Sequence, residues 1–279
     1  MTIAILLVTC CLEQTRYDAL EKVVENIKLD CPPAWREQMT VFDNSSNFLA
    51  HPKLEKLLKN FSQVYLSDKN VGYWTAISWW LDRLASQETP PTYTYIIESD
   101  VIHYASGYID RCASFLDQHP DIGSVRVHEY SVENMRFYNK DIPVIGARKN
   151  VWQSHINKVT NQAIVHRQVD GNFWSSNFLT HLPAVNRFSA MRSIFLKLSA
   201  LKQFTELDFQ RMYHDLYPVT SFVDGGIMTC EQDPCDKKLV TGSWTTPEEL
   251  KRLGYLSTRY ASIVSRDQYN VTKVDTVIV

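Results

Sequence analysis

Over the first 125 residues, apolar runs of strand length alternate with stretches in which apolar residues recur at helical spacing. The apolar runs predict strands at 3–8, 39–42, 63–66, 93–97 and 122–127. Between them, stripes of apolar residues three or four positions apart predict amphipathic helices, for example over 17–27 and 74–84. This βαβα order predicts an α/β fold with a mainly parallel central sheet flanked by helices.

The pattern loosens after about residue 126, where polar and aromatic residues mix without a sustained period. Two further helices are predicted there, at 189–201 and 209–216. No repeat, low-complexity tract or clear linker separates the two halves of the sequence. We therefore expect one compact domain with an irregular second half rather than two independent domains.

The composition is that of an ordinary globular protein. The chain has 279 residues, of which 44% are hydrophobic and 22% charged, and its net charge is −2, so a generally basic surface for nucleic acid or membrane is not expected. The charge is uneven, because residues 121–205 hold eleven Lys and Arg against five Asp and Glu, a surplus of +6 that leaves −8 for the remainder. The sequence thus predicts a basic middle segment within an acidic frame.

The first apolar run, residues 2–12, resembles a signal sequence in composition only. No basic residue precedes it, no small-residue cleavage site follows it, and it is about half as long as a bilayer span requires. Six cysteines are too few for a disulfide scaffold, so free thiols are expected. We therefore predict a soluble chain in the reducing cytoplasm, without a transmembrane segment.

Polar residues follow four of the predicted strands. Ligands of open parallel sheets bind beyond the carboxyl ends of the strands, and the residues at these ends are 9–13, 43–44, 70–72 and 98–100. Their convergence at one edge predicts a nucleotide site. The turn after the first strand contains no glycine, and no GxxxxGK[ST] sequence is present, so the chain lacks the dinucleotide-binding fingerprint and the P-loop.

The sharpest motif is Glu98-Ser99-Asp100, which follows a predicted buried strand. Carboxylates two residues apart on an extended chain point to the same side. Such a pair can hold a divalent cation that keeps water ligands and bridges substrate phosphates, where the cation neutralises charge that builds up on a departing diphosphate. The alternative is a solvated acid pair at the end of a strand.

Four segments carry a resemblance to a known family. They read TIAILLVTCCLEQ, MTVFDNSSN, KNVGYWTAISWWL and YTYIIESDVIHYASGYIDRCASFLDQHPDIG. In this order they resemble the nucleotide-sugar-binding half of family 2-like glycosyltransferases of the GT-A fold, over roughly residues 2–127. The resemblance implies an enzyme that moves a sugar from a nucleotide-diphosphate-sugar to a hydroxyl acceptor, assisted by Mn²⁺ or Mg²⁺.

The resemblance also implies roles for single residues. It implies that Asp100 and Glu98 hold the metal, although the family has aspartate where this chain has Glu98. It further implies that the donor is contacted by the polar residues of the strand ends and by one late arginine. These donor-binding candidates are Thr9, Glu13, Asp43, Asn44, Asn70, Gly72, Glu98, Ser99 and Arg259.

The segment FTELDFQR, residues 204–211, is similar to the family motif that carries the catalytic base. By this similarity Glu206 is the predicted base, with Asp208 as the second choice, and inversion at the anomeric carbon is implied. The structural alternative is that Thr205 caps a helix whose first turn favours acidic residues. His214 in the same helix is interpreted as a structural histidine rather than a metal ligand.

The resemblance divides the chain into a nucleotide-sugar-binding half (1–127), an acceptor-binding half (128–235) and a C-terminal extension closing over the site (236–279). A glycan or lipid-linked glycan is the favoured acceptor. Because the middle segment is basic, an anionic molecule such as hydroxymethylated DNA is an alternative acceptor. A further alternative is that the protein binds a nucleotide-sugar without catalysing its transfer. A sugar-nucleotide pyrophosphorylase is disfavoured, since the first turn is neither glycine-rich nor basic.

Overall fold

A computed structural model describes most of the N-terminal half and separate segments of the C-terminal half. The described residues are 2–46, 53–99, 101–103, 107–127, 147–148, 151–157, 162–170, 173–176, 183–217, 219–223, 227–229 and 260–274.

Helices and strands alternate through the N-terminal half. Its elements are β1 (Ile3–Thr9), α1 (Gln14–Asp30), α2 (Pro33–Gln38), β2 (Met39–Asp43), α3 (Leu54–Leu58), β3 (Gln63–Ser67), α4 (Tyr73–Ala85), β4 (Tyr93–Glu98), β5 (Val101–His103), α5 (Tyr108–Gln118) and β6 (Ile122–Val127). The described C-terminal elements are β7 (Ala147–Arg148), β8 (Val151–Asn157), β9 (Gln162–Asp170), β10 (Phe173–Ser176), β11 (Ala184–Arg187), α7 (Phe188–Ser199), α8 (Glu206–Leu216), β12 (Val219–Val223), β13 (Ile227–Thr229), the 3-10 helix η2 (Arg266–Gln268) and β14 (Val271–Val274).

The predicted parallel sheet is confirmed in the N-terminal half. Strand β1 pairs in parallel with β2 on one side and β4 on the other, and β3 pairs in parallel with β2. The main sheet has the order β14-β3-β2-β1-β4-β11-β6-β12-β10-β9-β8-β7 among the described strands. Because β1 to β4 all run in one direction, their carboxyl ends lie at the same edge.

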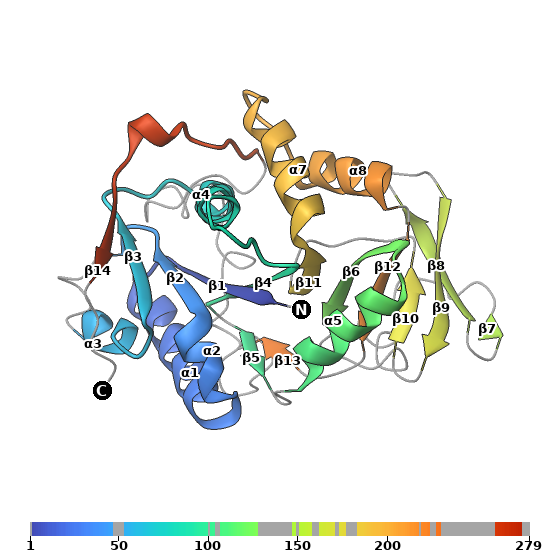
Figure 1. The fold of residues 1–279 in the computed structure, drawn as a ribbon, viewed down its shortest axis with the longest axis horizontal. Coiled ribbons are helices and arrows are strands. Elements are labelled where there is room, and N and C mark those ends of the chain that lie inside the picture. The colour runs from blue at the N-terminus through green and yellow to red at the C-terminus, as the bar shows by residue number, and fades with distance from the viewer. Residues whose placement is uncertain are drawn as a thin grey trace.

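Alternating side chains of the strands bury both faces of this sheet. In β1, Ile5 and Leu7 join a core with α1, α2, α3 and α5, whereas Leu6 and Val8 join a second core with α4, α7 and α8. Figure 1 shows these two groups of helices on opposite sides of the sheet. The α/β fold with flanking helices is therefore observed, as the sequence pattern predicted.

The sheet continues past residue 127, where the sequence predicted an irregular second half. Strand β11 lies between β4 and β6 and is antiparallel to both, while β12 pairs in parallel with β6. Arg187, the last residue of β11, donates to the carbonyls of Leu116, His119 and Ile122 at distances of 2.6, 3.0 and 2.9 Å, respectively. The positions of β11 and β12 therefore depend on hydrogen bonds to the N-terminal half. Apolar periodicity within each segment did not reveal these strands, because it carries no signal of such pairing.

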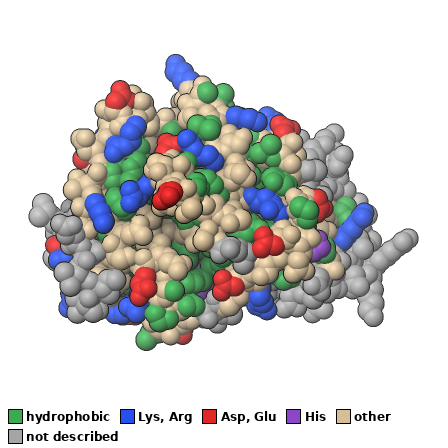
Figure 2. All heavy atoms as spheres, in the orientation of Figure 1, with side chains coloured by type: hydrophobic (Ala, Val, Ile, Leu, Met, Phe, Trp, Pro, Cys, Tyr) green, Lys and Arg blue, Asp and Glu red, His purple; other side chains and the backbone are tan. Residues whose placement is uncertain are grey.

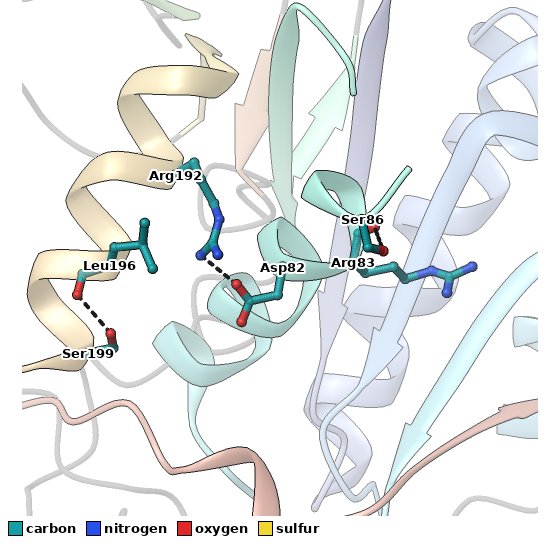
Figure 3. Close-up of polar contacts among 6 residues, drawn as sticks. All are labelled: Asp82, Arg83, Ser86, Arg192, Leu196 and Ser199. Atoms are coloured by element: carbon teal, nitrogen blue, oxygen red, sulfur yellow. Dashed lines mark hydrogen bonds and ion pairs between the residues drawn. The ribbon is translucent and has the colours of Figure 1, made fainter. Parts of the chain in front are cut away.

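Helices α4 and α7 pack side by side on one face of the sheet. Arg192 of α7 forms an ion pair with Asp82 of α4, with 2.5 Å between Nη1 and Oδ1 (Figure 3). The same view shows Ser86 and Ser199 closing the ends of the two helices, each donating to a carbonyl three residues earlier, at 2.7 and 2.8 Å. The ion pair is partly exposed and contributes about 0–1 kcal/mol, so the buried apolar contacts hold the helices together.

The molecular surface carries both signs of charge. On the face shown in Figure 2, Lys and Arg side chains are interspersed with Asp and Glu, in keeping with the net charge of −2. Among the described helices, none combines the length and the apolar character that a membrane span needs.

A buried polar cluster lies between α1 and the sheet. His103 of β5 is 1% exposed, and its Nε2 lies 3.3 Å from the hydroxyl of Tyr95, which in turn lies 3.0 Å from the hydroxyl of Tyr108. The ring of Trp35 meets the imidazole edge-on at 5.2 Å. Burial lowers the pKa of His103 to about 3, so the imidazole is neutral in the folded protein near neutral pH.

This buried histidine predicts a specific loss of stability in acid. The unfolded chain binds a proton at His103 below its ordinary pKa of about 6.5, whereas the folded chain does so only near 3. The free energy of unfolding should therefore fall as the pH drops from about 6.5 toward about 3, by up to about 1.4 kcal/mol per pH unit. His103→Phe should flatten this slope, as measured by urea unfolding between neutral pH and the onset of acid denaturation.

Tyr108→Phe is the matched control, because it removes a hydroxyl from the same cluster and leaves the imidazole in place. It should lower stability at every pH while keeping the wild-type slope. An unchanged slope in His103→Phe would contradict the assignment of the slope to this residue.

Candidate functional site

The ends of β1 and β2 are joined by the carboxylate of Asp43. This residue is 0% exposed. Its Oδ1 accepts hydrogen bonds from the Thr9 hydroxyl, at 2.7 Å, and from the Ser46 hydroxyl, and its Oδ2 accepts from the Ser46 backbone N–H at 3.1 Å. The Ser46 hydroxyl in turn accepts from the Cys11 N–H at 2.8 Å. The carboxylate thus holds both strand ends and the turn after β2.

Burial raises the pKa of Asp43, and the hydrogen bonds from Ser46 and Thr9 oppose that rise. Asp43 therefore has internal partners for both oxygens, and it shapes the wall of the site from within. Its direct contact with a nucleotide base, expected from the sequence resemblance, stays a prediction. Ser46 was missed by sequence reasoning, although its position in the turn cluster DNSS was a signal of it.

Asn44 extends this network to the loop after β3. Its backbone N–H donates to the carbonyl of Thr9 at 2.8 Å, and its Oδ1 accepts from the Val71 N–H at 2.8 Å. Its Nδ2 donates to Oδ1 of Asn70 at 2.9 Å, and the same oxygen accepts from the Gly72 N–H at 3.0 Å. The structure therefore brings together Thr9, Asp43, Asn44, Asn70 and Gly72, five of the predicted donor-binding residues, at one edge.

Cys10 is a further residue of this edge that the sequence did not single out. Its Sγ accepts a hydrogen bond from Asn70 Nδ2 at 3.6 Å. Burial, together with the nearby carboxylate of Asp43, raises the pKa of the Cys10 thiol to about 12. The thiol is therefore protonated at neutral pH and is a weak nucleophile.

Helix α4 begins directly at the site. Gly72 precedes it in a left-handed conformation, with φ of 82° and ψ of 158°, a region that is essentially restricted to glycine. The first N–H groups of a helix have no intrahelical partners and carry partial positive charge. The start of α4 therefore presents an environment that suits phosphate at the carboxyl edge of the sheet.

Glu98 ends β4 at the same edge, opposite Val8 of β1, and both Glu98 and Ser99 are half-buried. Asp100 lies outside the described residues. Within the described part of the chain, no three His, Cys, Asp or Glu side chains gather as metal ligands. Mg²⁺ in phosphate-transfer sites is usually held by one or two carboxylates together with waters and substrate phosphates, so a half-buried carboxylate at a strand end fits such an ion.

Glu13 lies beyond the end of β1 and is the residue at the N-terminal cap of α1. It is half-buried, and its carbonyl accepts the first hydrogen bond of the helix from the N–H of Tyr17 at 3.3 Å. Its position extends the row of polar strand-end residues, and its contact with a donor stays a prediction.

The start of α8 lies beside the start of α4. The ring of Trp74, in the first turn of α4, packs against Phe204 and Phe209, with 5.3 Å between ring centroids in each pair. Glu206 is the first residue of α8 and is exposed, and its Oε1 accepts from Gln210 Nε2 at 3.3 Å. The aromatic contacts thus place Glu206 on the side of the sheet where α4 begins.

Asp208 has a different environment from Glu206. Its Oδ2 accepts from the backbone N–H of Thr205 at 2.7 Å and from the Thr205 hydroxyl at 2.8 Å. These hydrogen bonds lower the pKa of Asp208. Asp208 therefore closes a capping box at the start of α8, whereas the Glu206 side chain is exposed.

The described part of the predicted C-terminal extension passes both helix starts. Phe204 and Ala261 form an antiparallel bridge, and Val264 N–H donates to the Thr75 hydroxyl of α4 at 3.1 Å. Further on, β14 pairs with β3 at the edge of the main sheet. Arg259, a predicted donor-binding residue, lies outside the described residues.

His214 lies in the last turn of α8. Eight residues of helix separate it from Glu206, which corresponds to roughly 12 Å along the axis. The structure therefore does not bring His214 to the site, in agreement with its interpretation as a structural residue.

No protein-family model matches the sequence, and no curated protein sequence matches it. Among solved structures, the chain is similar to TarS 1–349 from S. aureus in complex with UDP-GlcNAc, with 12% identity over 81% of this chain and 58% of that chain and a TM-score of 0.47. It is also similar to glucosyl-3-phosphoglycerate synthase from Mycobacterium tuberculosis in complex with Mg²⁺ and UDP, with 13% identity over 100% and 89% of the two chains and a TM-score of 0.43.

A third similar structure is the mannosyltransferase PcManGT from Pyrobaculum calidifontis with GDP-Man and Mn²⁺, with 16% identity over 50% of this chain and 37% of that chain and a TM-score of 0.37. The alignment with a further structure of TarS 1–349 spans 60% of that chain. At such low identity no ligand or activity carries over to this chain, and the α/β architecture follows from its own strand order.

The backbone at Gly72 predicts a measurable cost of substitution. Gly72→Ala forces a side chain into the left-handed conformation of φ 82°, so it should lower the free energy of unfolding by about 1–3 kcal/mol. The measurement is chemical unfolding of the variant beside the wild type.

Gly107→Ala is the matched control. Gly107 also precedes a helix, but its φ is −87° and an added Cβ would meet no described atom within 4 Å. This substitution should leave stability unchanged or slightly raised. Equal effects of the two substitutions would contradict the strain at Gly72.

Proposed function

We propose that this protein is a glycosyltransferase that moves a sugar from a nucleotide-diphosphate-sugar to a hydroxyl acceptor with inversion at the anomeric carbon. One observation carries the proposal. The carboxyl ends of β1 to β4 share one edge of the sheet, and α4 begins at this edge. Trp74 in the first turn of α4 packs against Phe204 and Phe209, which flank the exposed Glu206 at the start of α8. This arrangement supports the proposal that groups for the diphosphate, a metal ligand and a general base surround one space.

The donor half of the site is built from the strand-end network. Asp43 holds the ends of β1 and β2 together, and Asn44 ties them to the loop of Asn70 and Gly72. We infer that this rigid wall receives the nucleoside, with Glu13 at its border. The N-terminus of α4 favours the diphosphate by its partial positive charge.

We infer that Glu98 and Asp100 hold a divalent cation at the end of β4, with Ser99 in the same turn beside the donor. A bound Mn²⁺ or Mg²⁺ supplies Lewis-acid stabilisation of the departing diphosphate. The role of these residues is to hold the carboxylates at the edge where the diphosphate lies. Arg259, one residue before the described segment 260–274, is proposed as a further contact to the diphosphate.

We infer that Glu206 accepts the proton of the acceptor hydroxyl as that oxygen attacks the anomeric carbon. The C1–oxygen bond to the acceptor forms while the bond to the diphosphate breaks, and the pair of electrons leaves with the nucleoside diphosphate. A base that is fixed at a helix start and exposed to the site suits this role.

The acceptor is proposed to lie against residues 128–235, and the extension 236–279 is proposed to cover the site. A glycan or lipid-linked glycan is the favoured acceptor. An anionic acceptor such as hydroxymethylated DNA is supported only by the basic surplus of residues 121–205. DNA binding that weakens steeply as the salt concentration rises would distinguish this acceptor from a glycan.

Glu206→Gln tests the base. The substitution keeps size and polarity but removes the basic carboxylate, so sugar transfer should fall by about 10²–10⁴-fold while UDP or GDP binding stays unchanged. The measurement is product formation from donor and acceptor, with calorimetry for nucleotide binding.

Asp208→Ala separates the two candidate carboxylates. Because Asp208 closes the capping box, this variant should lose about 0.5–2 kcal/mol of stability and should retain transfer when folded. Transfer that survives in Glu206→Gln but is abolished in folded Asp208→Ala would move the base to Asp208.

Asp100→Ala tests the metal. Binding of UDP or GDP should be strengthened by Mn²⁺ in the wild type, because the cation bridges carboxylate and phosphates, and this strengthening should disappear in the variant. The rise in melting temperature on addition of the nucleotide, with Mn²⁺ or with a chelator, measures this effect of the metal in the wild type and in the variant. Retained metal dependence in Asp100→Ala, with unchanged transfer, would show that the metal assignment is wrong.

A further inference from the structure

The turn between α7 and α8 carries exposed apolar side chains. Figure 1 shows this turn projecting beyond the helices around it. Leu196, in the last turn of α7, is 52% exposed, and Leu201, in the connecting turn, is 39% exposed. The backbone N–H of Leu201 donates to the carbonyl of Leu198 at 3.0 Å, so Leu201 lies directly beyond the last turn of α7. We call residues 196–203 the α7–α8 tip.

The α7–α8 tip is also basic. Lys197 and Lys202 are both exposed, and residues 188–205 contain no Asp or Glu. Neither lysine forms an ion pair within the described part of the chain, whereas Arg192 further back in α7 is paired with Asp82. Figure 2, in the same orientation as Figure 1, shows Lys or Arg side chains beside hydrophobic ones at this tip. The tip therefore combines uncompensated positive charge with exposed leucines.

The next acidic residue along the chain is set apart from the tip. Phe204 is 2% exposed and belongs to the core with α4 and α7. Its N–H and carbonyl pair with the backbone of Ala261 at 2.9 and 2.8 Å. The chain thus returns to the body of the protein at Phe204, before Glu206 begins α8.

Leucines and lysines that share one projecting surface suit the interface of a bilayer with anionic headgroups. Apolar side chains enter the boundary between headgroups and acyl chains, about 5–10 Å deep, while the lysine ammonium groups stay at the lipid phosphates. Another folded protein could bury a projecting tip only in a matching groove, whereas a bilayer accepts it directly. Such docking requires no membrane-spanning helix.

We propose that the α7–α8 tip docks this protein on the surface of a bilayer that contains anionic lipids. The inference goes beyond the proposed function and does not rest on it, because vesicle binding is measured without a donor or an acceptor. Docking through this tip brings the start of α8, with Glu206, close to the lipid surface. Of the two proposed acceptor classes, a docked protein therefore favours the lipid-linked glycan.

The experiment is co-sedimentation with vesicles of phosphatidylcholine, with and without phosphatidylglycerol. The wild type should bind the anionic vesicles and bind the neutral ones much more weakly. The double variant Lys197→Gln and Lys202→Gln should lose affinity for the anionic vesicles by about fivefold per lysine. The double variant Leu196→Ser and Leu201→Ser should lose about tenfold or more. Because all four side chains are exposed, both variants should melt within a few degrees of the wild type.

Leu29→Ser is the matched control. Leu29 is 82% exposed, more than either leucine of the tip. It lies in α1, on the opposite side of the sheet from α7 (Figure 1), and its neighbours Lys28 and Asp30 carry opposite charges. This variant should bind anionic vesicles as the wild type does. A loss as large as that of the leucine variant of the tip would contradict the assignment to the tip.

Three results would overturn the proposal. The first is a wild type that does not bind anionic vesicles. The second is equal binding by the wild type and both tip variants, which places the contact elsewhere. The third is self-association of the wild type, measured by analytical ultracentrifugation, that the leucine substitutions abolish while no vesicle binding is found. The tip would then be a contact with a second copy of the chain. If the leucine variant does not fold, the lysine variant decides, because its substitutions leave the apolar surface unchanged.

Discussion

The buried carboxylate of Asp43 is the interaction on which the candidate site depends. A buried carboxyl group is costly unless hydrogen bonds satisfy its oxygens, and here Thr9 and Ser46 supply those bonds. The compensation requires the end of β1, the end of β2 and the following turn to meet at one point. Asn44 then carries the constraint to the loop before α4. The wall of the candidate site is therefore held together by hydrogen bonds to a buried carboxyl group as well as by apolar packing.

The site also depends on which segments the two cores bring to one side of the sheet. The core that contains α4, α7 and α8 places Trp74 against Phe204 and Phe209. These contacts bring the start of α8, more than 100 residues later in the chain than the end of β4, beside the start of α4. The antiparallel insertion of β11 between β4 and β6 carries the chain back across the sheet. The strand ends of the first half and the start of α8 from the second half thus share one scaffold.

The N-terminal half could be predicted closely because its signals are local. The predicted strand at 63–66 is β3, and the predicted helix at 74–84 is α4, each within a few residues of the observed bounds. The strands of the second half were missed because their pairing partners, not their periodicity, define them. For the site, the motifs identified Glu206 and Asp208 together, and only the hydrogen bonds of Asp208 to Thr205 separated a capping residue from an exposed carboxylate.

The sequence by itself determined the order of the four parallel strands and their main helices in the N-terminal half, and the collection of polar residues at the strand ends, because apolar periodicity and turn residues act within a few positions. The tertiary structure alone decided that Asp43 faces inward, that Cys10 and Ser46 join the hydrogen-bond network of the strand ends, and that Asn26 of α1 bonds to the backbone of His103 in β5. These features join residues up to 77 positions apart. No local pattern encodes such contacts, since they arise only when the parallel sheet has brought distant strand ends and α1 together.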